Sequence, residues 1–384
     1  MKKHVHRISI ALSLVFTCVS TAYATNMLFQ VHSELLDEDV TIRIALPESY
    51  PHSTDFDYPL LLVMDGSTQF NHIAGNIEFM STFAEIPDLI VVGISANNRL
   101  LNFTHTELEQ FAGRSGGAAR YTQFILEELL PKLREDYRIA SHTTVTGHSL
   151  SGLYSTYLAL HHAEDVQAAI SISPSLWWDD FAILSDIEQN TDVQASVNWF
   201  ASIATEPDEM EEGFARLESA LANLEKSNVR WELRRFDNET HDSTPLIGNV
   251  MGLRSVFQGF NAVPEIDVKS LEQLESFYND YAEASGYDIP MSVHQYNVYG
   301  LKATYEGQLL WGVEILEAGT EQFPYSEILW DSLATAYKMN DNQTSALNAS
   351  EKAVEYAHRH NSKYLSEIQL QNRSLKQDAH FIAD

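Results

Sequence analysis

The sequence predicts an α/β fold, in which a mostly parallel sheet is covered by helices on both faces, followed by a smaller all-helical region. Two observations lead to this prediction. Short, continuous apolar runs bounded by turn residues are typical of strands buried on both faces, and here they alternate with stretches of helical periodicity. From Pro264 onward the pattern is helical.

The expected elements follow one another in a regular order. An acidic turn at residues 37–39 joins the first two strands, and a polar loop with three glycines is expected over 97–117. The expected strands cover 28–35, 40–46, 59–64, 89–94, 143–146, 168–172, 197–203 and 229–236. The expected helices cover 73–83, 118–137, 150–160, 180–189, 208–226 and 271–281. Strands that alternate with helices favour a parallel sheet.

The chain is expected to divide into four segments. These are a signal peptide over 1–24, an α/β domain over 25–262, a linker helix within 263–290 and a helical region over 291–384. Within the last segment a period of 34 residues pairs Gly300 with Ala334. Small and aromatic residues then fall where tetratricopeptide repeats place their packing residues. Such a region is a possible binding surface for a protein partner.

The first 24 residues have the three parts of a secretory signal peptide in the correct order. Lys2, Lys3 and Arg7 form a basic start, an apolar run follows over 8–19, and a small-residue cleavage pattern ends at Ala24. We therefore expect export by a cleavable signal, to the periplasm or the medium. Beyond residue 25 no apolar stretch is long enough to cross a bilayer.

Charge and cysteine content exclude several classes of function. The 384 residues carry a formal charge of −30, and cleavage after Ala24 leaves 21 basic against 54 acidic side chains. Such a chain repels phosphate backbones, so nucleic acid is not an expected partner. Cleavage also removes Cys18, the one cysteine. The mature chain then has neither a disulfide nor a cysteine nucleophile.

The strongest local motif is Gly147-His148-Ser149-Leu150-Ser151, which follows a predicted strand and opens a predicted helix. This is the context of the G-x-S-x-G nucleophile elbow, where a sharp turn exposes the serine Oγ at the end of a strand. Ser151 replaces the second glycine and Gly152 follows it. Ser149 is therefore the candidate nucleophile.

An acid and a histidine follow Ser149 in the order that this type of site requires. His241 comes after the last predicted strand, and Glu206 and Asp208 come after the preceding one. His241 would act as general base and the acid would orient its imidazole. Pro207 between the two acids favours an extended segment, in which both carboxylates point the same way. Glu206 therefore stays open as the alternate acid.

The sequence between residues 28 and 260 resembles the esterase family of α/β-hydrolases. This family includes ferri-siderophore esterases, S-formylglutathione hydrolase and bacterial mycolyltransferases. The resemblance rests on Tyr58-Pro59-Leu60-Leu61-Leu62-Val63-Met64-Asp65-Gly66, Gly147-His148-Ser149-Leu150, Ser173-Pro174-Ser175-Leu176-Trp177-Trp178 and His241-Asp242-Ser243. It implies an α/β-hydrolase fold and a serine esterase activity on a small-molecule ester.

The resemblance also implies roles for further residues. The backbone amides of Leu150 and Ser67 would form the oxyanion hole. In this family the acid usually lies three residues after a glycine at the end of a strand. Thr205 takes the place of that glycine here, so the resemblance implies that the acid is Asp208. Arg99 is a candidate contact for a substrate carbonyl or carboxylate, with a solvent-exposed loop arginine as the alternative. Trp177 and Trp178 either line the substrate pocket or pack in the core.

No metal-ligand spacing, phosphate-binding loop or dinucleotide motif is found, so no metal or cofactor is expected. The sequence-based hypothesis is an exported serine carboxylesterase that works through an acyl-enzyme. The alternatives are an acyltransferase with the same nucleophile, and a non-catalytic binding protein that uses the helical repeats.

Overall fold

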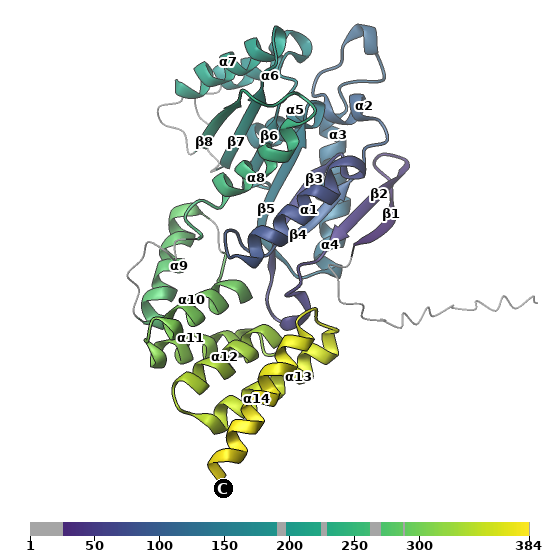
Figure 1. Cartoon of the computed structure of the whole chain (residues 1–384). Helices are drawn as coiled ribbons and strands as arrows, with labels where there is room; N and C mark the ends of the chain where they lie inside the picture. Colours follow the sequence, from purple (N-terminus) through teal and green to yellow (C-terminus); the bar gives the residue numbers. More distant parts are fainter. Residues whose placement is uncertain (1–25, 190–196, 224–228, 262–269, 287–288, 384) are drawn as a thin grey trace, which may run out of the picture.

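The computed structural model describes residues 26–189, 197–223, 229–261, 270–286 and 289–383. The predicted signal peptide, residues 1–24, lies outside the described residues. Figure 1 shows an α/β part that contains the sheet and, at one end of it, a part made only of helices. No helix in these ranges is long and apolar enough to span a membrane.

Eight strands form one sheet in the order β1-β2-β4-β3-β5-β6-β7-β8. β2 is antiparallel to both β1 and β4, and all other pairs are parallel. The strands are β1 (Met27–Ser33), β2 (Glu38–Ala45), β3 (Tyr58–Met64), β4 (Ile90–Ile94), β5 (Ile139–His148), β6 (Ala168–Ile172), β7 (Val197–Ala204) and β8 (Val229–Phe236). The predicted mostly parallel α/β architecture is confirmed.

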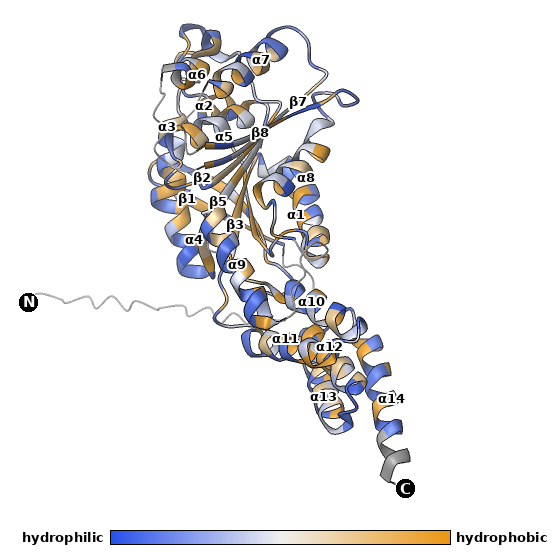
Figure 2. Ribbon diagram, turned by 90° about the vertical axis from the view of Figure 1, so that its left-hand side faces the viewer, coloured by the Kyte–Doolittle hydropathy of each residue, from blue (hydrophilic) through white to orange (hydrophobic). Residues whose placement is uncertain are grey.

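Helices cover both faces of this sheet, as Figure 2 shows with the strands seen nearly edge-on. One face packs against α1 (Gly66–Thr82) and α8 (Thr244–Val256). The other packs against α5 (Leu150–His161) and a helix that runs from α3 (Ala118–Gln123) through a π-helical turn (Phe124–Leu129) into α4 (Leu130–Asp136). Alternate residues of β3 enter the two cores, which explains why its whole sequence is apolar.

Shorter elements complete the α/β part. α6 (Trp178–Gln189) and α7 (Glu209–Ala222) follow β6 and β7, and a 3-10 turn (Tyr50–His52) precedes β3. The segment over 97–117, expected to be a loop, contains α2 (Arg99–Phe103) and a 3-10 turn (Glu109–Phe111).

The remaining helices are α9 (Leu271–Ser285), α10 (Val293–Tyr305), α11 (Leu309–Gln322), α12 (Glu327–Met339), α13 (Gln343–His360) and α14 (Leu365–Ala383). The first residues of α10 and α12 are 34 residues apart, and so are those of α11 and α13. The helix pairs thus repeat with the period seen in the sequence. Membership of the tetratricopeptide family remains a prediction.

The helical region packs against the amino-terminal ends of the parallel strands. The amide of Tyr325 donates to the carbonyl oxygen of His52, 3.0 Å away, just before β3. The rings of Phe56 and Phe323 lie 4.8 Å apart. The carboxyl ends of these strands lie at the other end of the α/β part, on the side of α7 in Figure 1.

Candidate active site

Ser149 lies in a sharp turn between β5 and α5, as the nucleophile-elbow motif predicts. Its φ and ψ angles are 62° and −119°, a conformation that is rare for a residue with a side chain. A Cβ atom on Gly147 would lie 2.0 Å from the carbonyl oxygen of Ser151. Glycine is therefore required at 147, because the strand and the helix nearly touch there.

Other strained residues follow neighbouring strands at the same edge of the sheet. Asp65, Ser173 and Asp208 come after β3, β6 and β7, and each has a positive φ angle. Backbone strain of this kind is maintained where surrounding contacts enforce it, and it concentrates at functional sites. Together with the turn at Ser149, these turns favour the carboxyl edge of the sheet as the candidate site.

His241 is hydrogen-bonded to Glu206. Its Nδ1 lies 2.9 Å from Oε2 of Glu206. The other carboxylate oxygen accepts hydrogen bonds from the Ser173 hydroxyl and, at 3.2 Å, from the Ala204 amide. Glu206 is buried, with 7% of its surface exposed. These contacts fix the carboxylate against the imidazole.

Asp208, the acid favoured from the sequence, lies elsewhere. It is exposed at the N-terminus of α7, and its side chain does not cap that helix. Among the described residues no hydrogen bond or ion pair joins it to His241, whose carboxylate partner is the alternate acid Glu206. The physical reason is the backbone: the turn at Asp208, with φ 60° and ψ −128°, leads the chain into α7, while Glu206 stays next to β7.

The electrostatics of the pair match its geometry. Burial would raise the pKa of Glu206, but hydrogen bonds from His241 and Ser173 outweigh it and lower that pKa below 4.5. The bond to Glu206 is the main cause that raises the pKa of His241 above 6.5, against the opposing effect of burial. Glu206 is therefore charged at neutral pH, and it favours a proton on His241 Nδ1.

His148, the residue before Ser149, packs its ring against His241 with 4.5 Å between the ring centroids. Burial, aided by the nearby His241, lowers the pKa of His148 to about 4, so this imidazole is neutral at physiological pH. The Ser149 Oγ lies 3.4 Å from the Oγ of Ser175. Between Ser149 and His241, both described, no hydrogen bond forms; catalytic hydrogen bonds are often long before substrate binds.

The two predicted oxyanion-hole amides lie at helix N-termini. Leu150 is the first residue of α5, and Ser67 is the second residue of α1. The first N–H groups of a helix have no partner within the helix and point outward at its positive end. Both amides can therefore donate to a negatively charged oxygen.

Arg99 forms a two-pronged ion pair with Asp65, with Nε and Nη2 at 2.6 and 2.8 Å from the two carboxylate oxygens. The buried Ser151 hydroxyl also donates to Asp65, at 2.7 Å. Ser151 thus has a specific partner where the motif usually has glycine. The positive charge of Arg99 is close enough to His241 to oppose its protonation.

The two tryptophans differ in their environments. Trp178 is buried, and its indole N–H donates to the Thr106 hydroxyl, 3.0 Å away. It packs in the core and connects α6 to the 97–117 segment, as in the alternative interpretation of the sequence. Trp177 is half-buried beside it.

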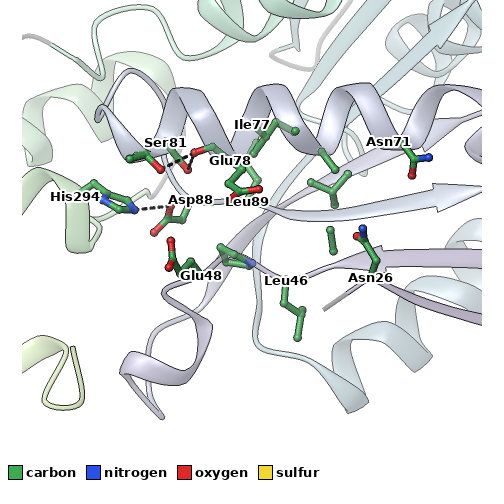
Figure 3. Close-up of a pocket in the computed structure, with 16 residues that line it drawn as sticks. Asn26, Leu46, Glu48, Asn71, Ile77, Glu78, Ser81, Asp88, Leu89 and His294 are labelled. Carbon is green, nitrogen blue, oxygen red and sulfur yellow. Dashed lines mark hydrogen bonds and ion pairs between the residues drawn. The ribbon is translucent and has the colours of Figure 1, made fainter. Parts of the chain in front are cut away.

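A separate cavity of about 200 Å³ lies along α1 and β2, drawn in Figure 3. Its lining includes Glu48, Asp88 and His294 and none of Ser149, Glu206 or His241. It therefore belongs to the end of the sheet where the helical region packs.

Comparison with known proteins relates the chain to esterases. Residues 33–211 match the family described as "Putative esterase". This part of the chain is therefore similar to the esterase family. The chain is a carboxylic ester hydrolase of the serine-hydrolase type. It is also similar to the ferri-bacillibactin esterase BesA of Bacillus subtilis, with 26% identity over 54% of this chain and 81% of that protein.

Solved structures show the same fold. An IroE-like serine hydrolase from Shewanella oneidensis is 26% identical, with a TM-score of 0.68 over 78% of this chain and 99% of its own. An uncharacterised protein from Capnocytophaga ochracea, 17% identical, has a TM-score of 0.57 over 90% of this chain and 99% of its own. Since residues 1–261 are only about two thirds of the chain, both similarities extend into the helical region.

Sequence reasoning missed two supporting side chains, Ser173 and Asp65. Ser173 holds Glu206, while Asp65 joins Arg99 to Ser151. Both lie within segments that carry the family resemblance, but nothing in their spacing indicates which side chain each one contacts.

Proposed function

We propose that this chain is an exported serine carboxylesterase whose triad is Ser149, His241 and Glu206. The observation that carries the proposal is the 2.9 Å contact between His241 and the buried Glu206, at the edge of the sheet where Ser149 occupies a strained turn. This arrangement supplies a nucleophile, a base and an anion that orients the base.

Each group has a defined task in the proposed reaction. Glu206 keeps the proton on Nδ1 of His241, so that Nε2 can accept the proton of Ser149 as Oγ attacks the ester carbonyl. The amides of Leu150 and Ser67 stabilise the oxyanion. His241 then donates the proton to the leaving alcohol, which forms an acyl-enzyme on Ser149. Water, deprotonated by His241, releases the acid and restores the serine.

Two observations support a proposal for the substrate class: the name of a relative and the position of Arg99. The name of the B. subtilis relative indicates an ester of an iron-binding compound. Arg99 is exposed near His241. Asp65 holds its Nε and Nη2, and the exposed remainder of the guanidinium can donate to an anionic group next to the scissile ester. We therefore propose an ester with a neighbouring anionic or catechol group, although the chain as a whole is strongly acidic.

The decisive experiment compares the unaltered protein with Ser149→Ala on a panel of p-nitrophenyl esters, a thioester and a ferric siderophore ester. Removing a triad nucleophile is expected to lower kcat by about 10⁴-fold or more. A fluorophosphonate probe should label Ser149, as peptide mapping would show, and circular dichroism should be unchanged. Turnover retained by Ser149→Ala would overturn the mechanism.

The proposed export has its own test. The N-terminal sequence of the protein recovered from the periplasm or medium should begin at Thr25, directly after the predicted cleavage site. A protein that keeps Met1 and stays in the cytoplasm would contradict it.

A further inference from the structure

Three side chains from distant parts of the sequence meet where the helical region packs against the α/β domain. His52 ends the 3-10 turn before β3, Glu327 is the first residue of α12, and His360 is the last residue of α13. His52 and Glu327 are almost fully buried, and His360 is 13% exposed at its side chain. None of the three belongs to the catalytic edge of the sheet.

Their donor atoms lie close to one another. Nε2 of His52 and Nδ1 of His360 are 3.2 and 3.0 Å from the same oxygen of Glu327, and the three ligand atoms lie within 4.8 Å of one another. Ligand atoms around a tetrahedral ion with bonds of about 2.0–2.1 Å are separated by about 3.3 Å. Small side-chain movements would therefore convert the cluster into a binding site.

The surrounding contacts show that the cluster joins two parts of the molecule. The Tyr325 amide is bonded to the carbonyl oxygen of His52, and Nζ of Lys363 lies 2.9 Å from Glu48. An ion held by one residue of the α/β domain and two of the helical region would cross-link them.

We propose that His52, Glu327 and His360 bind a divalent transition-metal ion and that this ion fastens the helical region to the α/β domain. Two imidazoles and one carboxylate are a donor set that suits Zn²⁺. The sequence predicted no metal because the ligands lie 275 and 33 residues apart, a spacing that no local motif contains. The site is structural, because it lies at the opposite end of the strands from Ser149.

The test uses the full exported chain without an affinity tag, stripped of metal with a chelator and then titrated with Zn²⁺ or Co²⁺. About one ion per chain should bind, and Co²⁺ should give the visible absorption of a tetrahedral complex. Saturating Zn²⁺ should raise the Tm by roughly 5 °C or more. The initial rate of ester hydrolysis at room temperature should not change.

Matched variants distinguish this site from adventitious binding. Glu327→Gln and His360→Gln should lose both the Co²⁺ absorption and the Tm response. His358→Gln, two residues away on the exposed side of α13, should keep both. Absence of stoichiometric binding to the unaltered chain, or equal binding by all three variants, would overturn the proposal and leave the cluster as a hydrogen-bonded contact.

Discussion

At the scale of single residues, the sequence favours Asp208 as the acid that orients His241, whereas the structure places Glu206 beside it. Glu206 and Asp208 are two residues apart, and an extended segment would present both to His241. Glu206 is held in place by the hydroxyl of Ser173, directly after β6, and by the amide of Ala204, the last residue of β7. Sequence spacing contains neither contact. The sequence favours Asp208 because the family resemblance places the acid three residues after the position of Thr205.

Two matched amide substitutions test the acid. Glu206→Gln should lower kcat by about 10²–10⁴-fold, because a neutral amide no longer stabilises the imidazolium or its tautomer. Asp208→Asn should change kcat by about tenfold or less, since the side chain is exposed and asparagine tolerates a positive φ angle. Steady-state kinetics on a p-nitrophenyl ester measures both, and the opposite order would reassign the acid to Asp208.

The pH profile provides a second test at this scale. His241 must be neutral to accept the serine proton, and its pKa is raised above 6.5, mainly by the hydrogen bond to Glu206. Activity should therefore rise with pH, with the midpoint of kcat/KM above 6.5. Glu206→Gln removes the carboxylate that is the main cause of the raised His241 pKa. The midpoint of the residual activity should therefore move to lower pH. An unchanged midpoint would show that Glu206 does not control His241.

At the scale of elements, the strands were predictable, whereas α2 and α8 were not. β3 and β4 are buried throughout and appear in the sequence as continuous apolar runs. α8 (Thr244–Val256) was missed because it contains glycines at 248 and 252, which lower helix propensity. These glycines allow the helix to pack closely on the sheet. A Cβ atom on Gly248 would lie 3.1 Å from the side chain of Ile172, and one on Gly252 would lie 2.5 Å from that of Ile170.

A glycine at a helix contact in the helical region allows a stability test. A Cβ atom on Gly300 of α10 would lie 2.4 Å from Cγ of Leu316 in α11. Gly300→Ala should therefore lower the free energy of unfolding by about 1–3 kcal/mol. Gly75→Ala in α1, where nothing lies within 4 Å, should instead raise it by roughly 0.5–1 kcal/mol. Urea denaturation measures both, and equal effects would contradict this account of the packing.

At the scale of the whole molecule, the alternation of strands and helices, the elbow and the two-part organisation all followed from local patterns. The contacts between the two parts did not, because they join residues far apart in sequence, such as Phe56 with Phe323 and His52 with Glu327. Local periodicity shows which face of a helix is apolar, but not which surface covers it.

Removal of the helices after residue 261 tests how much these contacts contribute to the stability of the α/β part. Phe56 and Phe260 are buried and make ring contacts with Phe323 and Tyr278, so a shortened chain would expose both to water. We expect a lower Tm and self-association, with a kcat within a few fold of the full chain at temperatures where it stays folded. Differential scanning fluorimetry and light scattering measure the first two, and an unchanged Tm would show that the contacts contribute little.

The opposite placement of the catalytic edge and the helical region has a practical consequence. The C-terminus lies at the far end of α14, on the other side of the molecule from α7 and the segments that carry Glu206 and His241 (Figure 1). A support or carrier coupled at that end would hold every molecule with the carboxyl edge of its sheet turned toward the solution. Immobilised through its C-terminus, the chain would form an oriented layer, whereas random attachment through surface lysines would block a share of the sites.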